Sequence, residues 1–428
     1  MIGKPLDIRH SVQATPLHVL NPTILGQTVN WAGMWAVFGR FAAPVTPGPE
    51  DVSGLAAAIK QGQLTAQSIV AIMGKTEGNG CVNDFTRGYA TQSIVHFLAE
   101  QLGVPPAAVK EKVALVMSGG TEGAISPHLV VFCIEDPDNA DGGQHSPISV
   151  LDAVPSLKQS SVAANGDGAK RLAMGVAFTR DFLPEEQGRM TQVLQTAEAV
   201  HKAMAAAGIC RPEDVHFVQI KCPLLTKGRM EEAASRGKTT ATANTYASMA
   251  YSRAASALGV AVALGEVPAK SLTDADICNN WGLYSGCAST SSGIELLRNE
   301  VLVLGNSSEW GGNLVVGHAV MQDAIDADAA RNALEGVGIA AAGQLSRADR
   351  QRVVAVLAKA EASHDGLVRG RRHTMQDDSD ISATRHARAV VGGVLAGLIG
   401  DTMLYVSGGA EHQGPDGGGP VAIIAKAE

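Results

Sequence analysis

The stretch VHFVQIKCPLL, residues 215–225, resembles a buried strand that ends in a lysine, Lys221. Two other stretches repeat this arrangement: SIVAIMGKTEG ends its apolar run at Lys75, and RVVAVLAKAEA ends its run at Lys359. The steps between successive lysines are 146 and 138 residues, about the length of one domain. An ammonium at the edge of a core is costly unless something uses it. The recurrence therefore predicts three diverged copies of one unit, each with a functional lysine.

Each lysine follows the same two elements. The first is a short apolar strand, expected at WAVFGRFAAP, RLAMGVAFTR and NLVVGHAVM. The second is an Ala-rich stretch with apolar residues at helical spacing, at VSGLAAAIKQG, AEAVHKAMAAAGI and AARNALEGVGI. We therefore divide the chain into an N-terminal extension (1–33), unit A (34–143), unit B (144–309) and unit C (310–428).

An arginine and a Ser-Gly turn follow each lysine in the same order. Unit A has Arg87 and then Ser118-Gly119, and unit C has Arg388 and then Ser407-Gly408. Unit B has Arg253 and then Ser291, Ser292 and Gly293. An apolar strand follows each turn, at HLVVFC, EVLVLGN and PVAIIA. Because glycine lets the backbone approach a ligand closely, we expect an α/β fold in which three repeats surround a pseudo-threefold axis, with the active site at its centre.

Composition excludes several classes of function. The 428 residues carry a net charge of −8 without a basic patch, which argues against nucleic acid as a partner. No run of about 18 apolar residues could span a membrane, and the first twenty residues lack the apolar core of a signal peptide. The six cysteines form no CxxC pair, so reduced thiols and a cytoplasmic location are expected.

Several long motifs carry a resemblance to a known family. KTEGNGCVNDFTRGYA, MSGGTEG, KCPLLTKGRM, SRAASALG, RGRRHTMQDDSDISATRHARAVV and SGGAEHQGPDGGGPVA resemble motifs of the ring-opening amidohydrolases, the cyanuric acid hydrolase and barbiturase family. The resemblance runs from about residue 36 to the C-terminus and leans toward the cyanuric acid hydrolase branch. It implies hydrolysis of cyanuric acid to carboxybiuret, which loses CO₂ to give biuret, by a homotetrameric enzyme.

The threefold pattern suits a threefold ligand. Cyanuric acid alternates three carbonyls with three N–H groups around a flat ring, and each unit offers an arginine that can donate to a ring oxygen. The resemblance implies the same mode of binding. The expected substrate-binding residues are Arg87, Ser118, Gly119, Arg253, Ser292, Arg388, Ser407 and Gly408.

Unit B departs from its copies, because it alone has Ser-Ser-Gly and Lys-Cys-Pro. By resemblance, Ser291 is the nucleophile and Lys221 its general base, a role that requires a neutral amine. Lys75 and Lys359 are expected to hold neighbouring serines or to tune the charge of the site. Ser285 in LYSG is the alternative nucleophile, but Ser291 lies nine residues before the next strand, close to the ten in unit A, and Ser285 lies fifteen before it.

A structural cation is a separate expectation. Glu361 and the loop AEHQGPDGGG offer one carboxylate, one amide side chain and several carbonyls, an all-oxygen set that suits Mg²⁺ or Ca²⁺. By resemblance the ligands are Glu361, Ala410, Gln413, Gly414, Pro415 and Gly418.

Three alternatives stay open at this point. A barbiturase would open barbituric acid, in which CH₂ replaces one ring N–H, and the segment SATRHAR around Arg388 is our candidate for the contact that discriminates the two rings. A protein that binds cyclic ureides without catalysis is a second alternative, and release of biuret would distinguish it. A scaffold is the third, and it needs no matched Lys, Arg and Ser sets.

Overall fold

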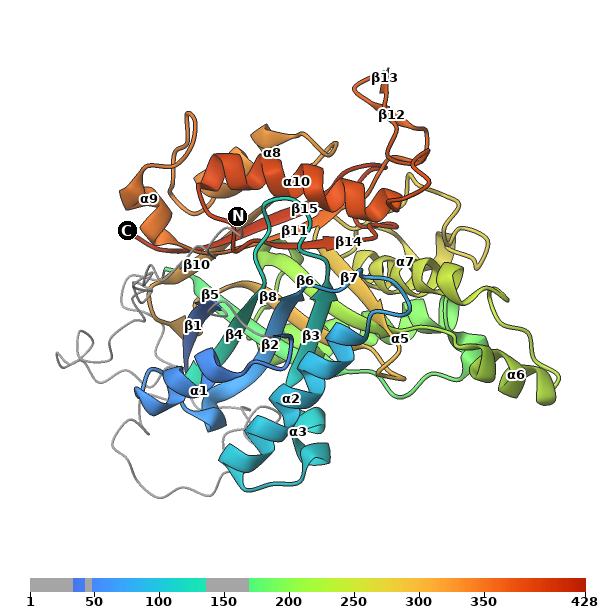
Figure 1. Cartoon of the computed structure of the whole chain (residues 1–428), viewed down its shortest axis with the longest axis horizontal. Coiled ribbons are helices and arrows are strands. Elements are labelled where there is room, and N and C mark those ends of the chain that lie inside the picture. The colour runs from blue at the N-terminus through green and yellow to red at the C-terminus, as the bar shows by residue number, and fades with distance from the viewer. Residues whose placement is uncertain (1–33, 43–47, 136–168) are drawn as a thin grey trace, which may run out of the picture.

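The computed structural model describes residues 48–135 and 169–428, together with the backbone of 34–42. The N-terminal extension and the predicted boundary between units A and B lie outside the described residues. The described chain forms three α/β bodies that meet at the centre of the molecule (Figure 1). Unit C lies at the top of the view, unit A at the lower left and unit B at the lower right.

Each unit is built on four strands in one shared topology. The first strand pairs antiparallel with the fourth, the fourth pairs antiparallel with the second, and the second pairs parallel with the third. In unit A these strands are β1 (Met34–Ala42), β2 (Ile69–Thr76), β3 (Ala114–Gly119) and β4 (His128–Glu135). In unit B they are β5 (Arg171–Phe178), β6 (Val215–Pro223), β7 (Ala288–Gly293) and β8 (Glu300–Ser307). In unit C they are β10 (Leu314–Met321), β11 (Val353–Ala360), β14 (Tyr405–Gly408) and β15 (Gly419–Lys426).

Helices occupy equivalent places in the three units. Between the first and second strands lie α1 (Ser53–Lys60), α5 (Met190–Ala206) and α8 (Ala327–Glu335). Between the second and third strands lie α2 (Phe85–Leu102), α7 (Thr245–Ala263) and α10 (Ala383–Ile399), and these carry the three arginines. Smaller elements are α3 (Pro106–Lys112), α6 (Lys227–Ser235), α9 (Arg347–Arg352), the pair β12 (Leu367–Val368) and β13 (Arg371–Arg372), and β9 (Trp310–Gly311), which pairs with β1. The predicted α/β fold of three similar repeats is confirmed.

Small residues let helices and sheets approach closely. A Cβ on Gly175 of β5 would lie 1.9 Å from the carbonyl oxygen of Ala203 in α5, so no larger residue fits there. One buried cluster joins residues from β2, β6 and β11, among them Met73, Ile220 and Leu357. The lysine-bearing strands therefore share a common core, and their ends lie next to one another.

Two observations bear on the expectations from composition. Of the helices in the described ranges, none combines the length and the apolar character needed to cross a membrane. All six cysteines lie in described segments, and all are free thiols.

Candidate active site

The three lysines lie opposite the three serines in equivalent parallel strand pairs. Lys75 is in register with Ser118, Lys221 with Ser291, and Lys359 with Ser407. All three lysines are at most 2% exposed. The strand ends open onto one cavity, which collects all eight predicted substrate-binding residues and Ser291. Its lining is Gly80, Arg87, Ser118, Gly119, Met249, Arg253, Ser291, Ser292, Arg388, Ser407 and Gly408.

The lysines tie the units to one another in a closed cycle. Each Nζ donates to the carbonyl of the residue just before the serine of another unit. Lys75 of unit A donates to Val406 of unit C (2.8 Å), and Lys359 of unit C donates to Thr290 of unit B (2.8 Å). Lys221 of unit B closes the cycle by donating to Met117 of unit A (2.7 Å). Each lysine therefore positions the strand that presents a neighbouring unit's serine.

Unit B differs from its copies at the serine. Lys75 Nζ donates to Ser118 Oγ and Lys359 Nζ donates to Ser407 Oγ, each at a distance of 3.2 Å. Lys221 Nζ instead lies 3.1 Å from the carboxylate of Glu295. Ser291 Oγ is buried and has no hydrogen-bond partner among the described residues. The hydroxyl of Ser291 is thus the one of the three that no lysine or serine engages within the described structure.

Burial lowers the pKa of all three lysines. For Lys75 the pKa falls well below its usual value, first because of burial and then because of Arg388. For Lys359, burial and Arg253 lower the pKa to about 7. Burial also lowers the pKa of Lys221, where Glu295 opposes the shift and Arg87 adds to it. A lysine with a lowered pKa carries a larger fraction of neutral amine at neutral pH, as a general base requires.

A repeated glutamate, not predicted from the sequence, accompanies the serines. Glu122, Glu295 and Glu411 each lie four residues after Ser118, Ser291 and Ser407. The spacing Ser-x-Gly-x-Glu recurs in all three units and could have revealed them. Glu122 forms a bidentate pair with Arg388 (2.6 and 2.8 Å), and Glu411 forms one with Arg253 (2.5 and 2.7 Å). These pairs cross from one unit to the next and hold the two guanidinium groups at the cavity wall.

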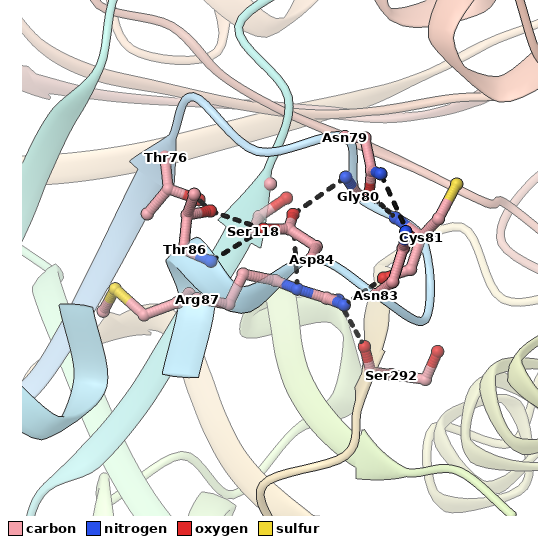
Figure 2. A network of polar contacts seen from close by, with 12 residues as sticks. Thr76, Asn79, Gly80, Cys81, Asn83, Asp84, Thr86, Arg87, Ser118 and Ser292 are labelled. Atoms are coloured by element: carbon pink, nitrogen blue, oxygen red, sulfur yellow. Dashed lines mark hydrogen bonds and ion pairs between the residues drawn. The ribbon is translucent and has the colours of Figure 1, made fainter. Parts of the chain in front are cut away.

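The third arginine has a different set of partners (Figure 2). Arg87 donates to the carbonyl oxygens of Ser292 (2.8 Å) and Cys81 (2.5 Å), and its Nε lies 3.5 Å from Asp84. Asp84 caps α2 by accepting from Thr86 N–H (3.1 Å) and also accepts from Gly80 N–H (2.8 Å). The Asp84 carboxylate therefore fixes both the helix start and the loop that faces the cavity.

Two glycines of the serine turns leave room for the arginines. Gly120 and Gly409 adopt φ of 103° and 80°, in the region that favours glycine. A Cβ on Gly120 would lie 2.5 Å from the guanidinium of Arg388, and one on Gly409 would lie 2.4 Å from that of Arg253. Any side chain at either position would displace an arginine from the cavity.

The chain resembles known proteins over most of its length. The amidohydrolase ring-opening protein family matches residues 43–426. A cyanuric acid amidohydrolase of Enterobacter cloacae is 54% identical over 386 residues, which cover 90% of this chain and 98% of the relative. One of Bradyrhizobium diazoefficiens is 55% identical over 382 residues, with 89% and 96% covered.

Solved structures agree with this likeness. A cyanuric acid hydrolase described as an evolutionary innovation by structural concatenation superposes with a TM-score of 0.81 at 49% identity, covering 92% of this chain and all of the other. The cyanuric acid hydrolase from A. caulinodans gives a TM-score of 0.79 at 52% identity, with 92% and 99% covered.

The chain belongs to the ring-opening amidohydrolase family.

In this ring-opening amidohydrolase, Ser285 lies away from the cavity. Its side chain is fully buried, its N–H donates to the His412 carbonyl (3.0 Å), and its Oγ accepts from Cys287 N–H (3.2 Å). Ser285 is not among the cavity-lining residues. The geometry thus favours Ser291 over the alternative nucleophile.

The expected cation site of this ring-opening amidohydrolase lies behind the unit C serine turn. Glu361 is buried, and burial together with the neighbouring Glu411 raises its pKa. The amide side chain of Gln413, which the sequence offered as a ligand, is engaged within the protein: it accepts from Thr290 N–H (2.7 Å) and donates to the Gly409 carbonyl (3.0 Å). Within the ranges that the structure describes, no group of three or more His, Cys, Asp or Glu residues could hold a metal. A cation here would rest on Glu361 and main-chain carbonyls.

Proposed function

We propose that this chain hydrolyses cyanuric acid, opening its ring to carboxybiuret, with Ser291 as nucleophile and Lys221 as general base. Two findings support the substrate. The cavity presents three arginines and three serine turns from three equivalent units, which matches the threefold alternation of carbonyl and N–H in the ring. Relatives at 54–55% identity are cyanuric acid amidohydrolases.

The observation that carries the choice of nucleophile is the unpartnered hydroxyl of Ser291. A buried hydroxyl without a partner loses free energy unless a ligand engages it. The equivalent hydroxyls of Ser118 and Ser407 accept hydrogen bonds from Lys75 and Lys359 and lie 3.4 Å from each other. We infer that those two serines position the ring, and that Ser291 attacks it.

The reaction proceeds in two balanced halves. Neutral Lys221 takes the Ser291 proton as Oγ bonds to a ring carbonyl carbon, and the oxyanion is met by N–H groups of a serine turn. The ring C–N bond then breaks, and the leaving nitrogen takes the proton from Lys221. Water attacks the acyl group, gives one proton back through Lys221 to Ser291, and releases carboxybiuret. Loss of CO₂ from carboxybiuret gives biuret.

The arginines supply binding and charge stabilisation. Arg253 and Arg388 are fixed by Glu411 and Glu122, so their guanidinium groups lose little further freedom when substrate arrives. Arg87 lies at the wall nearest unit B, where it contacts the Ser292 carbonyl. We infer that these groups donate to ring oxygens in the bound state.

We also propose that a divalent cation, Mg²⁺ or Ca²⁺, braces the unit C turn through Glu361 and carbonyls of residues 410–418. The donor set fits: a buried carboxylate crowded by Glu411 gains from a cation, and oxygen ligands suit a hard ion. Its role would be structural, since it would hold the loop that carries Glu411 behind Ser407. The tetrameric assembly that the resemblance implies stays a prediction, which light scattering tests.

One experiment tests the function directly. The protein is incubated with cyanuric acid and barbituric acid side by side, and the loss of each ring's absorbance and the release of biuret are followed. We expect turnover of cyanuric acid, none in Ser291→Ala, and retained binding of the ring by that variant. Mass spectrometry of trapped acyl-enzyme should place the label on Ser291. Faster turnover of barbituric acid than of cyanuric acid would identify barbituric acid as the substrate. A label on Ser285, Ser118 or Ser407 would identify that serine as the nucleophile in place of Ser291.

A further inference from the structure

The repeated glutamates break the threefold pattern at one place. Glu122 of unit A pairs with an arginine of unit C, and Glu411 of unit C pairs with an arginine of unit B. The same rule would pair Glu295 of unit B with Arg87 of unit A. In the structure Glu295 instead contacts Lys221 of its own unit, with Nζ and Oε1 3.1 Å apart.

The glycine turns also show that unit B differs from units A and C. Where a Cβ on Gly120 or Gly409 would meet a guanidinium group, a Cβ on the equivalent Gly293 would meet the carboxylate of Glu295, at 2.2 Å. Glu295 thus folds back over its own turn toward Lys221. Arg87, left without that carboxylate, bonds to main-chain carbonyls and lies near Asp84.

We propose that Glu295 is a positioning residue for the reaction: it holds the amine of Lys221, the residue in register with Ser291, and sets the pH at which that amine becomes a free base. The inference rests on the proposed function, in which Lys221 is that base. It explains why only unit B, the unit with the unpartnered serine, has its glutamate on the lysine rather than on an arginine.

The charges around Lys221 fix the direction of the effect. Glu295 from the β7–β8 connection favours the ammonium form, and Arg87 from α2 favours the neutral form. Cys222 on the same strand and Glu300 on β8 also interact electrostatically with the amine, and each favours the ammonium form when ionised. Burial of Lys221, whose side chain is 1% exposed, opposes the charge. Among these carboxylates only Glu295 contacts Nζ directly, so its removal has the largest effect on the amine.

Glu295 also connects the amine to solvent. Its side chain is 20% exposed to solvent, whereas the side chain of Lys221 is 1% exposed. The pair can hold a proton as ammonium and carboxylate or, after transfer of that proton from Nζ to Oε1, as neutral amine and carboxylic acid. Their titration therefore belongs to the pair, and the carboxylate offers the buried amine a route for proton exchange with water.

The test is the pH dependence of kcat/KM for cyanuric acid in Glu295→Gln, Glu295→Asp and the parent. Loss of the carboxylate charge removes the group that favours the ammonium form. We expect the ascending limb of the profile to move to lower pH by about 1–3 units in Glu295→Gln. Glu295→Asp keeps the charge at a greater distance and should give a smaller shift in the same direction. Glu231→Gln on the exposed α6 surface is the matched control and should leave the profile unchanged.

Lys221→Ala in the same assay separates the two proposals. If Lys221→Ala is inactive and the ascending limb of both Glu295 variants stays in place or moves to higher pH, the role of Glu295 is wrong, and Ser291 and Lys221 stand as nucleophile and base. If Lys221→Ala retains turnover with the parental limb, the proposed base is wrong and the inference falls with it. Thermal unfolding of each variant and calorimetric binding of cyanuric acid in a Ser291→Ala background confirm that the folded site is being measured. A Glu295→Gln profile that only drops in height, at an unchanged pH, indicates a merely structural contact and overturns the inference.

Discussion

Glu300→Gln should stabilise the protein at alkaline pH and have little effect at acidic pH. Glu300 begins β8 and reaches into the contact between units A and B, where its Oε2 accepts from Leu115 N–H (3.1 Å). Burial raises its pKa from 4.5 to about 7, against the opposing effects of that hydrogen bond and of Arg298. The carboxyl group is therefore protonated more readily in the folded chain than in the unfolded chain.

The sign and size follow from proton linkage. Between pH 4.5 and 7 the folded state binds more protons than the unfolded state, so the contribution of this group is fully present below pH 4.5 and is lost as the pH rises through 7. A shift of this size corresponds to about 3 kcal/mol, since one pKa unit is worth about 1.4 kcal/mol. Glutamine cannot ionise, and its amide oxygen can still accept from Leu115. The variant should therefore gain up to about 3 kcal/mol relative to the parent at pH 8.

The assay is urea unfolding of parent and variant at pH 5 and pH 8, with Glu335→Gln on the exposed end of α8 as the matched control. We expect a higher unfolding midpoint for Glu300→Gln at pH 8 and nearly equal midpoints at pH 5. The same difference at both pH values, or a gain matched by Glu335→Gln, would refute the claim that Glu300 resists ionisation in the folded state.

The other predictions concern the site. Ser118→Ala and Ser407→Ala should each lower kcat/KM by about ten- to a hundredfold, the value of a lost positioning hydrogen bond, and steady-state kinetics that find either variant wholly inactive would contradict a positioning role. Glu361→Ala, or treatment of the parent with a chelator, should lower the melting temperature by several degrees if a cation binds only the folded state. Elemental analysis that finds no bound cation, together with an unchanged melting temperature, would show that the protein has no structural cation at this site. Gly409→Ala should destabilise the fold by about 1–3 kcal/mol and weaken substrate binding, because a Cβ there meets Arg253; calorimetry that finds parental affinity would show that Arg253 does not bind the ring.

The sequence predicted the repeated elements because the repetition was visible in three independent places. Lys75, Lys221 and Lys359 each stand at the end of an apolar run, and each lies opposite its serine in the structure. Symmetry then required the strand ends to meet, and the cavity gathers the arginines and serines that this argument named.

The acidic partners were not predicted, although their spacing was readable. Glu122 and Glu411 stand in glycine-rich turns, where a carboxylate is ordinarily solvated, and nothing local indicates that each reaches an arginine more than 150 residues away. The contact between Glu295 and Lys221 was still harder to predict. The Glu295 carboxylate lies near both Lys221 and Arg87, and only the tertiary fold shows that it contacts Lys221. The side chain of Gln413 also looked like a free ligand, and only the tertiary fold revealed that it holds Thr290 in place.

The cycle of lysines has a consequence for how the chain reaches its native state. Each buried lysine amine donates to a main-chain carbonyl on a different unit, so a unit folded alone would lose that hydrogen bond, at a cost of about 1–3 kcal/mol for each bond. No pair of units can satisfy all of its lysines without the third. Assembly of the three bodies should therefore be a single cooperative transition, and two-unit fragments cut from this chain should remain only loosely ordered until the missing unit is supplied.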